Sequence, residues 1–72
     1  MEEMNLKIFA ERLSELRAEK GMTTRQLGAE IKTAHDVIAK LEKGDRMPLA
    51  GSVYKLAKFF NVSSDYLLGL QD

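Results

Sequence analysis

The apolar residues of this chain recur every three or four positions in a series of short stretches, and a glycine or small polar residue interrupts each stretch. That period places the apolar side chains on one face of a helix, so each stretch predicts a short amphipathic helix. No stretch shows the convincing two-residue alternation of a half-buried strand. Because the chain has only 72 residues, it can form one modest core. The pattern therefore predicts a single all-α domain over residues 1–72.

Glycines and threonines mark where these helices begin and end. Gly21 and Gly44 each follow a lysine at the end of a stretch, and glycine adopts the left-handed conformation of a helix end without a Cβ clash. Thr23 or Thr24 offers a hydroxyl to cap the second helix, and Thr33 offers one to cap the third. We expect helices over residues 6–20, 24–31, 34–43 and 50–60, and a short fifth helix that starts at Ser63 or Ser64 and ends at Leu68.

The composition excludes several classes of protein. The chain has no cysteine, which removes thiolate nucleophiles and thiolate zinc sites and fits a reducing cytoplasm. Its one histidine, His35, has no second histidine beside it from which a catalytic or metal centre could be built. No apolar run approaches the roughly 20 residues of a membrane-spanning helix, and the start MEEMN is acidic, unlike a secretory signal. We therefore expect a cytoplasmic protein that is not an enzyme, with no metal, cofactor, membrane partner or evident small-molecule site.

The charge of the chain is balanced. It has 11 basic and 11 acidic residues, and this balance counts against nucleic-acid binding because a basic patch is the usual footprint of such proteins. Between residues 25 and 46, five basic side chains stand against four acidic ones. A positively charged surface would therefore have to arise from the way in which the helices place these side chains.

The third expected helix has two distinct faces. At about 100° per residue, one side presents Val37, Ile38 and Leu41, which we expect to be buried. The opposite side carries a continuous, mostly polar arc made of His35, Asp36, Ala39, Lys40 and Lys43. The helix therefore predicts a surface that is free to meet a partner.

The geometry and chemistry of this arc suit the major groove of DNA. A helix about 10 to 12 Å across fits a groove about 12 Å wide, and the small side chain of Ala39 would permit close approach. Lys40 can donate to guanine acceptors, and His35 and Asp36 at the start of the helix can reach base edges. The residues expected to contact bases are His35, Asp36, Ala39 and Lys40. The residues that would flank the groove and contact phosphates are Thr24, Arg25, Thr33, Lys43 and Arg46.

The residues of this arc are also compatible with roles that do not involve base recognition. Every surface helix has a polar arc, so the arc alone does not establish DNA binding. The Asp36 carboxylate would also stabilise a helix N-terminus through the macrodipole, and its charge repels phosphate. His35 could be solvated or could contact a phosphate instead of a base.

The segment TTRQLGAEIKTAHDVIAKLEKGDRMP resembles the helix-turn-helix of phage-repressor and Cro-type (Xre-like) transcriptional regulators. The similarity extends to LSELRAEKGM before this segment and to LAKFFNVSSDYLLG at the end of the chain, so it covers nearly the whole sequence. It implies a lambda-repressor-like DNA-binding domain, a compact five-helix bundle whose helix-turn-helix spans about residues 24–43.

The resemblance also implies roles for individual residues. It assigns base contacts to the positions of His35, Asp36 and Lys40, and phosphate contacts to those of Lys43 and Arg46. Thr24 stands where the family often has a glutamine that touches the DNA backbone. Gly28 stands where a small residue lets the second and third helices cross closely. Arg17 and Glu42 match an ion pair that links the first and third helices.

The sequence departs from the family pattern at two positions. Lys32 stands at the tight turn where the family usually has glycine, so either Lys32 adopts a positive φ or the turn is rebuilt. Ala34 stands where the third helix usually has a serine or threonine, and Thr33 is the expected replacement cap.

The implied function is that of a sequence-specific regulator, expected to be a repressor, which binds double-stranded DNA as a homodimer on a two-fold operator. The half-sites of such an operator lie about 34 Å apart. The candidates for an apolar surface between two copies are Met47, Leu49, Phe59, Tyr66 and Leu70. Some of these side chains could complete the core instead, above all Phe59 and Leu49. Two alternatives use the same fold: a protein-interaction module without DNA affinity, and an antitoxin-type regulator.

Overall fold

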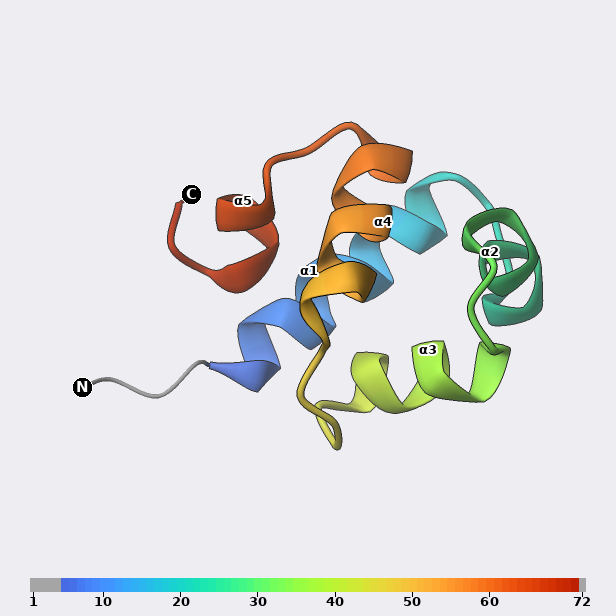
Figure 1. Ribbon diagram of the computed structural model, residues 1–72, viewed down its shortest axis with the longest axis horizontal. Helices are drawn as coiled ribbons and strands as arrows, with labels where there is room; N and C mark the ends of the chain where they lie inside the picture. The colour runs from blue at the N-terminus through green and yellow to red at the C-terminus, as the bar shows by residue number, and fades with distance from the viewer. Residues whose placement is uncertain (1–4, 72) are drawn as a thin grey trace.

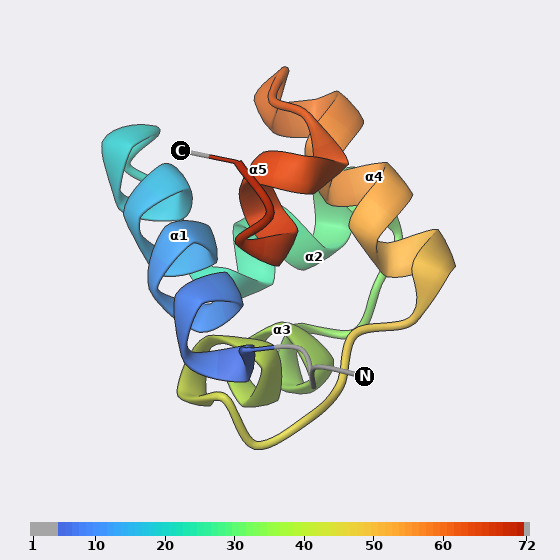
Figure 2. The ribbon, with the colours of Figure 1, turned by 90° about the vertical axis from the view of Figure 1, so that its left-hand side faces the viewer.

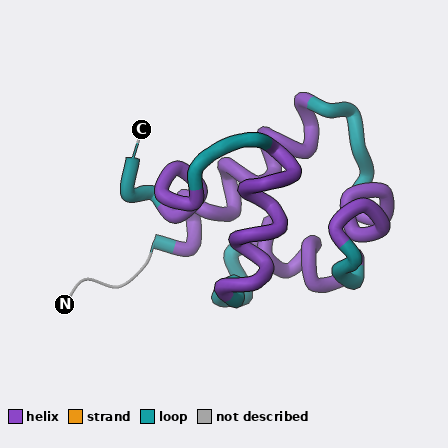
Figure 3. Tube along the Cα trace, turned by 45° about the horizontal axis from the view of Figure 1, so that its top comes forward, coloured by secondary structure: helices purple, strands orange, loops and turns teal. Residues whose placement is uncertain are grey.

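The computed structural model describes residues 5–71, which form five helices joined by short loops (Figure 1). The helices are α1 (Leu6–Glu19), α2 (Thr24–Ile31), α3 (His35–Lys43), α4 (Ala50–Phe60) and α5 (Ser64–Leu68). The described residues contain no strand, as Figure 3 also shows. The predicted all-α fold is therefore confirmed, and each helix boundary lies within one residue of its predicted position.

Side chains at the starts of α1, α2 and α5 satisfy amide groups that the helix itself leaves free. The Asn5 side chain accepts hydrogen bonds from the amides of Lys7 and Ile8, at 3.0 and 3.2 Å. Thr23, not Thr24, caps α2: its hydroxyl accepts from the Gln26 amide at 3.1 Å, and the Gln26 side chain accepts from the Thr23 amide at 2.8 Å. This reciprocal pair is a capping box, a purely local arrangement that the sequence already encodes.

The expectation that Thr33 caps α3 is wrong. The residue at the N-cap is Ala34, which has no side chain able to accept a hydrogen bond, and no side-chain cap is present. Thr33 lies one position too early in the turn, and its hydroxyl donates to the Ile31 carbonyl oxygen at 3.5 Å. The amides of the first turn of α3 therefore have no side-chain cap, and Asp36 is the one acidic residue of that turn.

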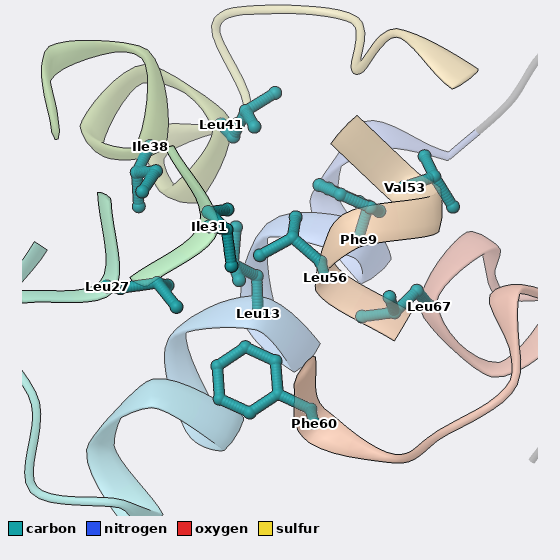
Figure 4. Close-up of a cluster of buried hydrophobic side chains, with 10 residues drawn as sticks. All are labelled: Phe9, Leu13, Leu27, Ile31, Ile38, Leu41, Val53, Leu56, Phe60 and Leu67. Atoms are coloured by element: carbon teal, nitrogen blue, oxygen red, sulfur yellow. The ribbon is translucent and has the colours of Figure 1, made fainter. Parts of the chain in front are cut away.

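The core is a cluster of apolar side chains drawn from all five helices (Figure 4). Its members are Phe9, Leu13, Leu27, Ile31, Ile38, Leu41, Val53, Leu56, Phe60 and Leu67. The amphipathic faces predicted from the three-to-four-residue period meet in this cluster, and their burial is the main contribution to stability.

Contacts made by Arg12 hold α5 and the residues that follow it against α1. The Arg12 guanidinium lies 4.3 Å from the centre of the Tyr66 ring. The same guanidinium donates to the carbonyl oxygens of Tyr66 and Gln71. The C-terminal turn is thus tied to the first helix through one arginine.

Within residues 5–71, no helix combines the length and apolar character that a membrane crossing requires. The same residues contain no cluster of three or more histidine, aspartate or glutamate side chains that could hold a metal ion.

Candidate nucleic-acid interface

α2 and α3 are joined by a three-residue turn that starts at Lys32. Lys32 has φ 56° and ψ 48°, the left-handed conformation, so it adopts the backbone that glycine usually supplies at this position. The Thr33 amide donates to the Gly28 carbonyl oxygen at 2.9 Å and closes the turn. The sequence left two possibilities at this position, a positive φ at Lys32 or a rebuilt turn. The structure has the positive φ.

Gly28 is the point at which the turn passes closest to α2. A Cβ atom placed on Gly28 would lie 2.5 Å from the backbone oxygen of Thr33 and 3.3 Å from the backbone nitrogen of His35. Because both neighbours are backbone atoms, they cannot move aside without displacing the start of α3. The close crossing implied for this glycine is therefore present.

α3 lies along one edge of the molecule, where it packs on α1 and α2 (Figures 1 and 2). Its inward side chains include Ile38 and Leu41, with exposed fractions of 0% and 1%. The third predicted inward residue, Val37, is only half-buried and packs against the margin of the core.

The opposite face of α3 is open to solvent. Asp36, Lys40 and Lys43 are exposed, and Ala39 and His35 are half-buried. The part of the chain that the structure describes does not cover this face, so the predicted arc is accessible to a partner.

The residues predicted to contact phosphate lie towards the two ends of this face. At one end, Arg25 and Thr33 line a shallow depression of about 360 Å³ together with His35. At the other end, Lys43 is the last residue of α3 and Arg46 is exposed in the following loop. Thr24, the first residue of α2, is half-buried, and it does not line the depression.

Lys32 also lines the depression beside Arg25 and His35, and the sequence prediction did not include it among the site residues. Because Lys32 follows α2 in the left-handed conformation, helical spacing from Arg25 could not have indicated its place, and the path of the turn brings it to the depression. The turn position that departs from glycine therefore adds a cation to this end of the face.

An ion pair fixes α3 to α1 on the inward side. Arg17 Nε lies 2.6 Å from Glu42 Oε2, and Arg17 Nη2 donates to Glu42 Oε1 at 2.8 Å. Ser14 Oγ also donates to Glu42 Oε1, at 2.9 Å, and Arg17 Nη1 donates to the Met22 carbonyl oxygen at 2.7 Å. The hydrogen bonds to Glu42 raise the pKa of Arg17 above its usual value, against the opposing effect of burial.

The hydrogen-bond network extends beyond the predicted Arg17–Glu42 pair to Ser14 and Met22. Because the side chains of Arg17 and Glu42 are only 23% and 11% exposed, their hydrogen bonds are partly shielded from water. The bond to Met22 also holds the loop that leads into α2. Ser14 and Met22 were not among the predicted residues, and serine or methionine at these positions carries no sequence signal for the role.

The apolar side chains proposed for pairing two copies divide into two groups. Met47, Leu49 and Leu70 are exposed, at 55%, 65% and 75%, so the expectation that Leu49 completes the core is wrong. Leu49 precedes α4 as its N-cap residue, and the helix directs only later side chains inward. Phe59 and Tyr66 are half-buried: Phe59 packs against the core with its ring edge-on to Phe60, as expected, and Tyr66 lies against the Arg12 guanidinium.

Tyr54 is the exposed apolar residue that the sequence prediction missed, at 62% exposure. It lines a groove of about 690 Å³ between α4 and α5. Most of the side chains around this groove are apolar, and they include Pro48, Val53 and Leu68.

Comparison with known proteins also identifies a helix-turn-helix domain. A family model described as a helix-turn-helix domain matches residues 10–72. The HTH-type transcriptional activator BcrR of Enterococcus faecalis is 37% identical over 60 residues, which are 83% of this chain and 29% of that protein. An uncharacterized HTH-type transcriptional regulator of Archaeoglobus fulgidus is 34% identical over 61 residues, 85% of this chain and 87% of that one.

Among solved structures, the restriction-modification controller protein C.AhdI from Aeromonas hydrophila is similar, with a TM-score of 0.78 and 27% identity. The match covers 86% of this chain and 94% of that one. The family model includes the whole α2–turn–α3 unit described above, together with most of α1 and all of α4 and α5. The chain therefore belongs to the helix-turn-helix domain family, and its resemblance to phage-repressor and Cro-type regulators is confirmed.

Proposed function

We propose that this chain is the DNA-binding domain of a transcriptional regulator and that α3 enters the major groove of its site. The observation that carries the proposal is the open face of α3, which presents Asp36 and Lys40 to solvent while Ile38 and Leu41 anchor the helix inward. A helix of this diameter fits the groove. The small side chain of the half-buried Ala39 would let the middle of this face approach the base edges closely.

The phosphate contacts in this proposal come from both ends of α3. Arg25, Lys32 and Thr33 would meet one side of the groove, and Lys43 and Arg46 would meet the other. Thr24 would donate to a phosphate from the first turn of α2. Two separated groups of cations suit a duplex better than one compact patch does, because the phosphates run along both margins of the groove. They also explain how a chain with no net charge could bind DNA.

The proposed direction of regulation is repression through occupancy of an operator, which follows from the resemblance to phage repressors. The relative from Enterococcus faecalis is named an activator, so membership of the family does not by itself set the direction. The chain spans 29% of that protein's length, and any further activity of a longer regulator lies outside the proposal.

A salt titration on generic duplex DNA tests the DNA-binding proposal. We expect affinity to fall with salt at a log-log slope of about −0.9 per neutralised phosphate. Arg46→Ala should make the slope shallower by about 0.9, since it removes one phosphate contact. Filter binding or fluorescence anisotropy over a range of salt concentrations measures both slopes.

The matched control is Lys20→Ala. Lys20 is exposed at the end of α1 that lies away from α3 (Figures 1 and 2). It contacts the Phe59 ring and none of the proposed DNA-contacting residues in the described structure. This variant should keep the slope of the unaltered chain. Weak binding that does not respond to salt would reject the proposal and favour a protein-interaction module.

We also propose that two copies pair through the groove between α4 and α5. The exposed Tyr54 lines this mostly apolar groove, and the exposed Met47 and Leu49 flank Pro48, another of its lining residues, in the sequence. A two-fold axis uses the same patch on both copies, so each copy would insert its exposed side chains into the groove of the other. A second copy is therefore the proposed occupant, and it would present two α3 helices to a two-fold operator.

Tyr54→Glu should weaken this pairing, because it places a charge in the apolar groove. The variant is expected to bind a duplex with two half-sites no more tightly than a duplex with one, whereas the unaltered chain should prefer two. Ala18→Glu adds the same charge at an exposed position of α1 and should leave the preference unchanged. If Tyr54→Glu and Ala18→Glu change the preference for two half-sites equally, the pairing surface lies elsewhere. Sedimentation equilibrium provides an independent measurement of the association.

A further inference from the structure

Asp36 and Lys40 are exposed on the open face of α3, and neither is engaged by its own chain. Their spacing of four positions would allow an ion pair along the helix. In the described structure, however, the ion pair of α3 is made by Glu42 with Arg17, and no bridge joins Asp36 to Lys40. Both charged groups are therefore free to interact with a ligand.

The Asp36 carboxylate has a restricted choice of partners in the major groove. An ionised carboxylate only accepts hydrogen bonds, and its charge is repelled by the phosphates. Guanine and thymine present only acceptors and a methyl group there, so they offer the carboxylate nothing in return. Adenine pairs its amino donor with a neighbouring N7 acceptor, whereas cytosine presents its N4 amino group alone. A hydrogen bond from the N4 amino group of cytosine would therefore offset the repulsion between the Asp36 carboxylate and the phosphates.

The Lys40 ammonium has the opposite chemistry. It carries three donors and no acceptor. Guanine presents two acceptors, O6 and N7, on one edge and is the base best matched to it. Four helical positions separate Asp36 from Lys40 by about 6 Å along the axis, which is close to two base-pair steps of about 3.4 Å each.

We propose that Asp36 and Lys40 select a cytosine and a guanine within two base-pair steps of each other in each half-site, and that Asp36 acts mainly by rejecting guanine and thymine. This inference rests on the proposed function and adds the base preference of its recognition helix. The half-buried Ala39 lies on the same face and gives the short Asp36 side chain access to the base edges.

The test is selection of bound duplexes from a library with a random central segment, carried out with the unaltered chain and with Asp36→Asn. The unaltered chain should select cytosine at one position and guanine within two steps of it. Asparagine pairs with adenine N6 and N7, so Asp36→Asn should change the preferred base at that one position from cytosine to adenine by about tenfold. Loss of a negative charge should also strengthen binding to generic DNA.

Two controls separate base selection from a purely structural role for Asp36. Glu30→Gln removes the same charge from an exposed position of α2 and should leave the selected sequence unchanged. Lys40→Ala should abolish the preference for guanine and keep the preference for cytosine. If Asp36→Asn lowers thermal stability but selects the same bases as the unaltered chain, Asp36 serves the helix dipole and the inference is overturned. Failure of the unaltered chain to show salt-dependent binding would instead reject the proposed function.

Discussion

Gly28→Ala should destabilise the domain by about 3 kcal/mol, the upper part of the range for an overpacked site. The added Cβ would lie 2.5 Å from the Thr33 backbone oxygen, so the turn and the start of α3 must move apart. For a chain of this length the whole stability is on the order of 4–11 kcal/mol, so the loss is a large fraction. Denaturant unfolding followed by circular dichroism measures the effect. DNA affinity should fall as well, because the turn sets the direction in which α3 projects.

Gly51→Ala is the matched control for this prediction. Gly51 lies in α4, it is exposed, and a Cβ atom there meets nothing within 4 Å. Alanine has a higher helix propensity, so Gly51→Ala should stabilise the domain by about 0.5–1 kcal/mol. Equal effects of the two substitutions would show that helix propensity, and not the close crossing at Gly28, governs both sites.

Glu42→Ala should cost about 2–3 kcal/mol, because it leaves the partly buried Arg17 without its charge partner. Arg17 loses two hydrogen bonds to the carboxylate and Ser14 loses one. The pKa of Arg17 is raised in the folded state, so its charge favours folding throughout the neutral range and this contribution is lost only in strong alkali. The cost of Glu42→Ala should therefore be the same at neutral and at moderately basic pH.

A double substitution distinguishes the net contribution of the Arg17–Glu42 ion pair to stability from the stability lost when only one partner is removed. Arg17→Met together with Glu42→Leu should be less destabilising than Glu42→Ala alone, because no uncompensated charge is left behind. Glu11→Ala, at an exposed position of α1, serves as the control and should change stability by less than about 0.5 kcal/mol. A loss of the same size for Glu11→Ala would contradict a specific role for Glu42.

The amino-acid sequence by itself determined where the helices form and where most of them end. The repeat of apolar residues predicted all five helices, and Gly21 and Gly44 adopt the left-handed conformation that ends a helix. The Thr23–Gln26 capping box depends on residues three positions apart. These features follow from local sequence because the groups that interact are close neighbours along the chain.

The tertiary structure alone decided the features that join distant parts of the chain. Glu42 gains the Ser14 hydroxyl through the packing of α3 on α1, and Lys32 joins the depression at the start of α3 through the path of the turn. The exposure of Leu49 depends on the direction in which the α3–α4 loop meets α4. Periodicity describes one helix at a time, whereas these contacts depend on the angles and distances between helices, which are set only when the separate apolar faces close on a common core.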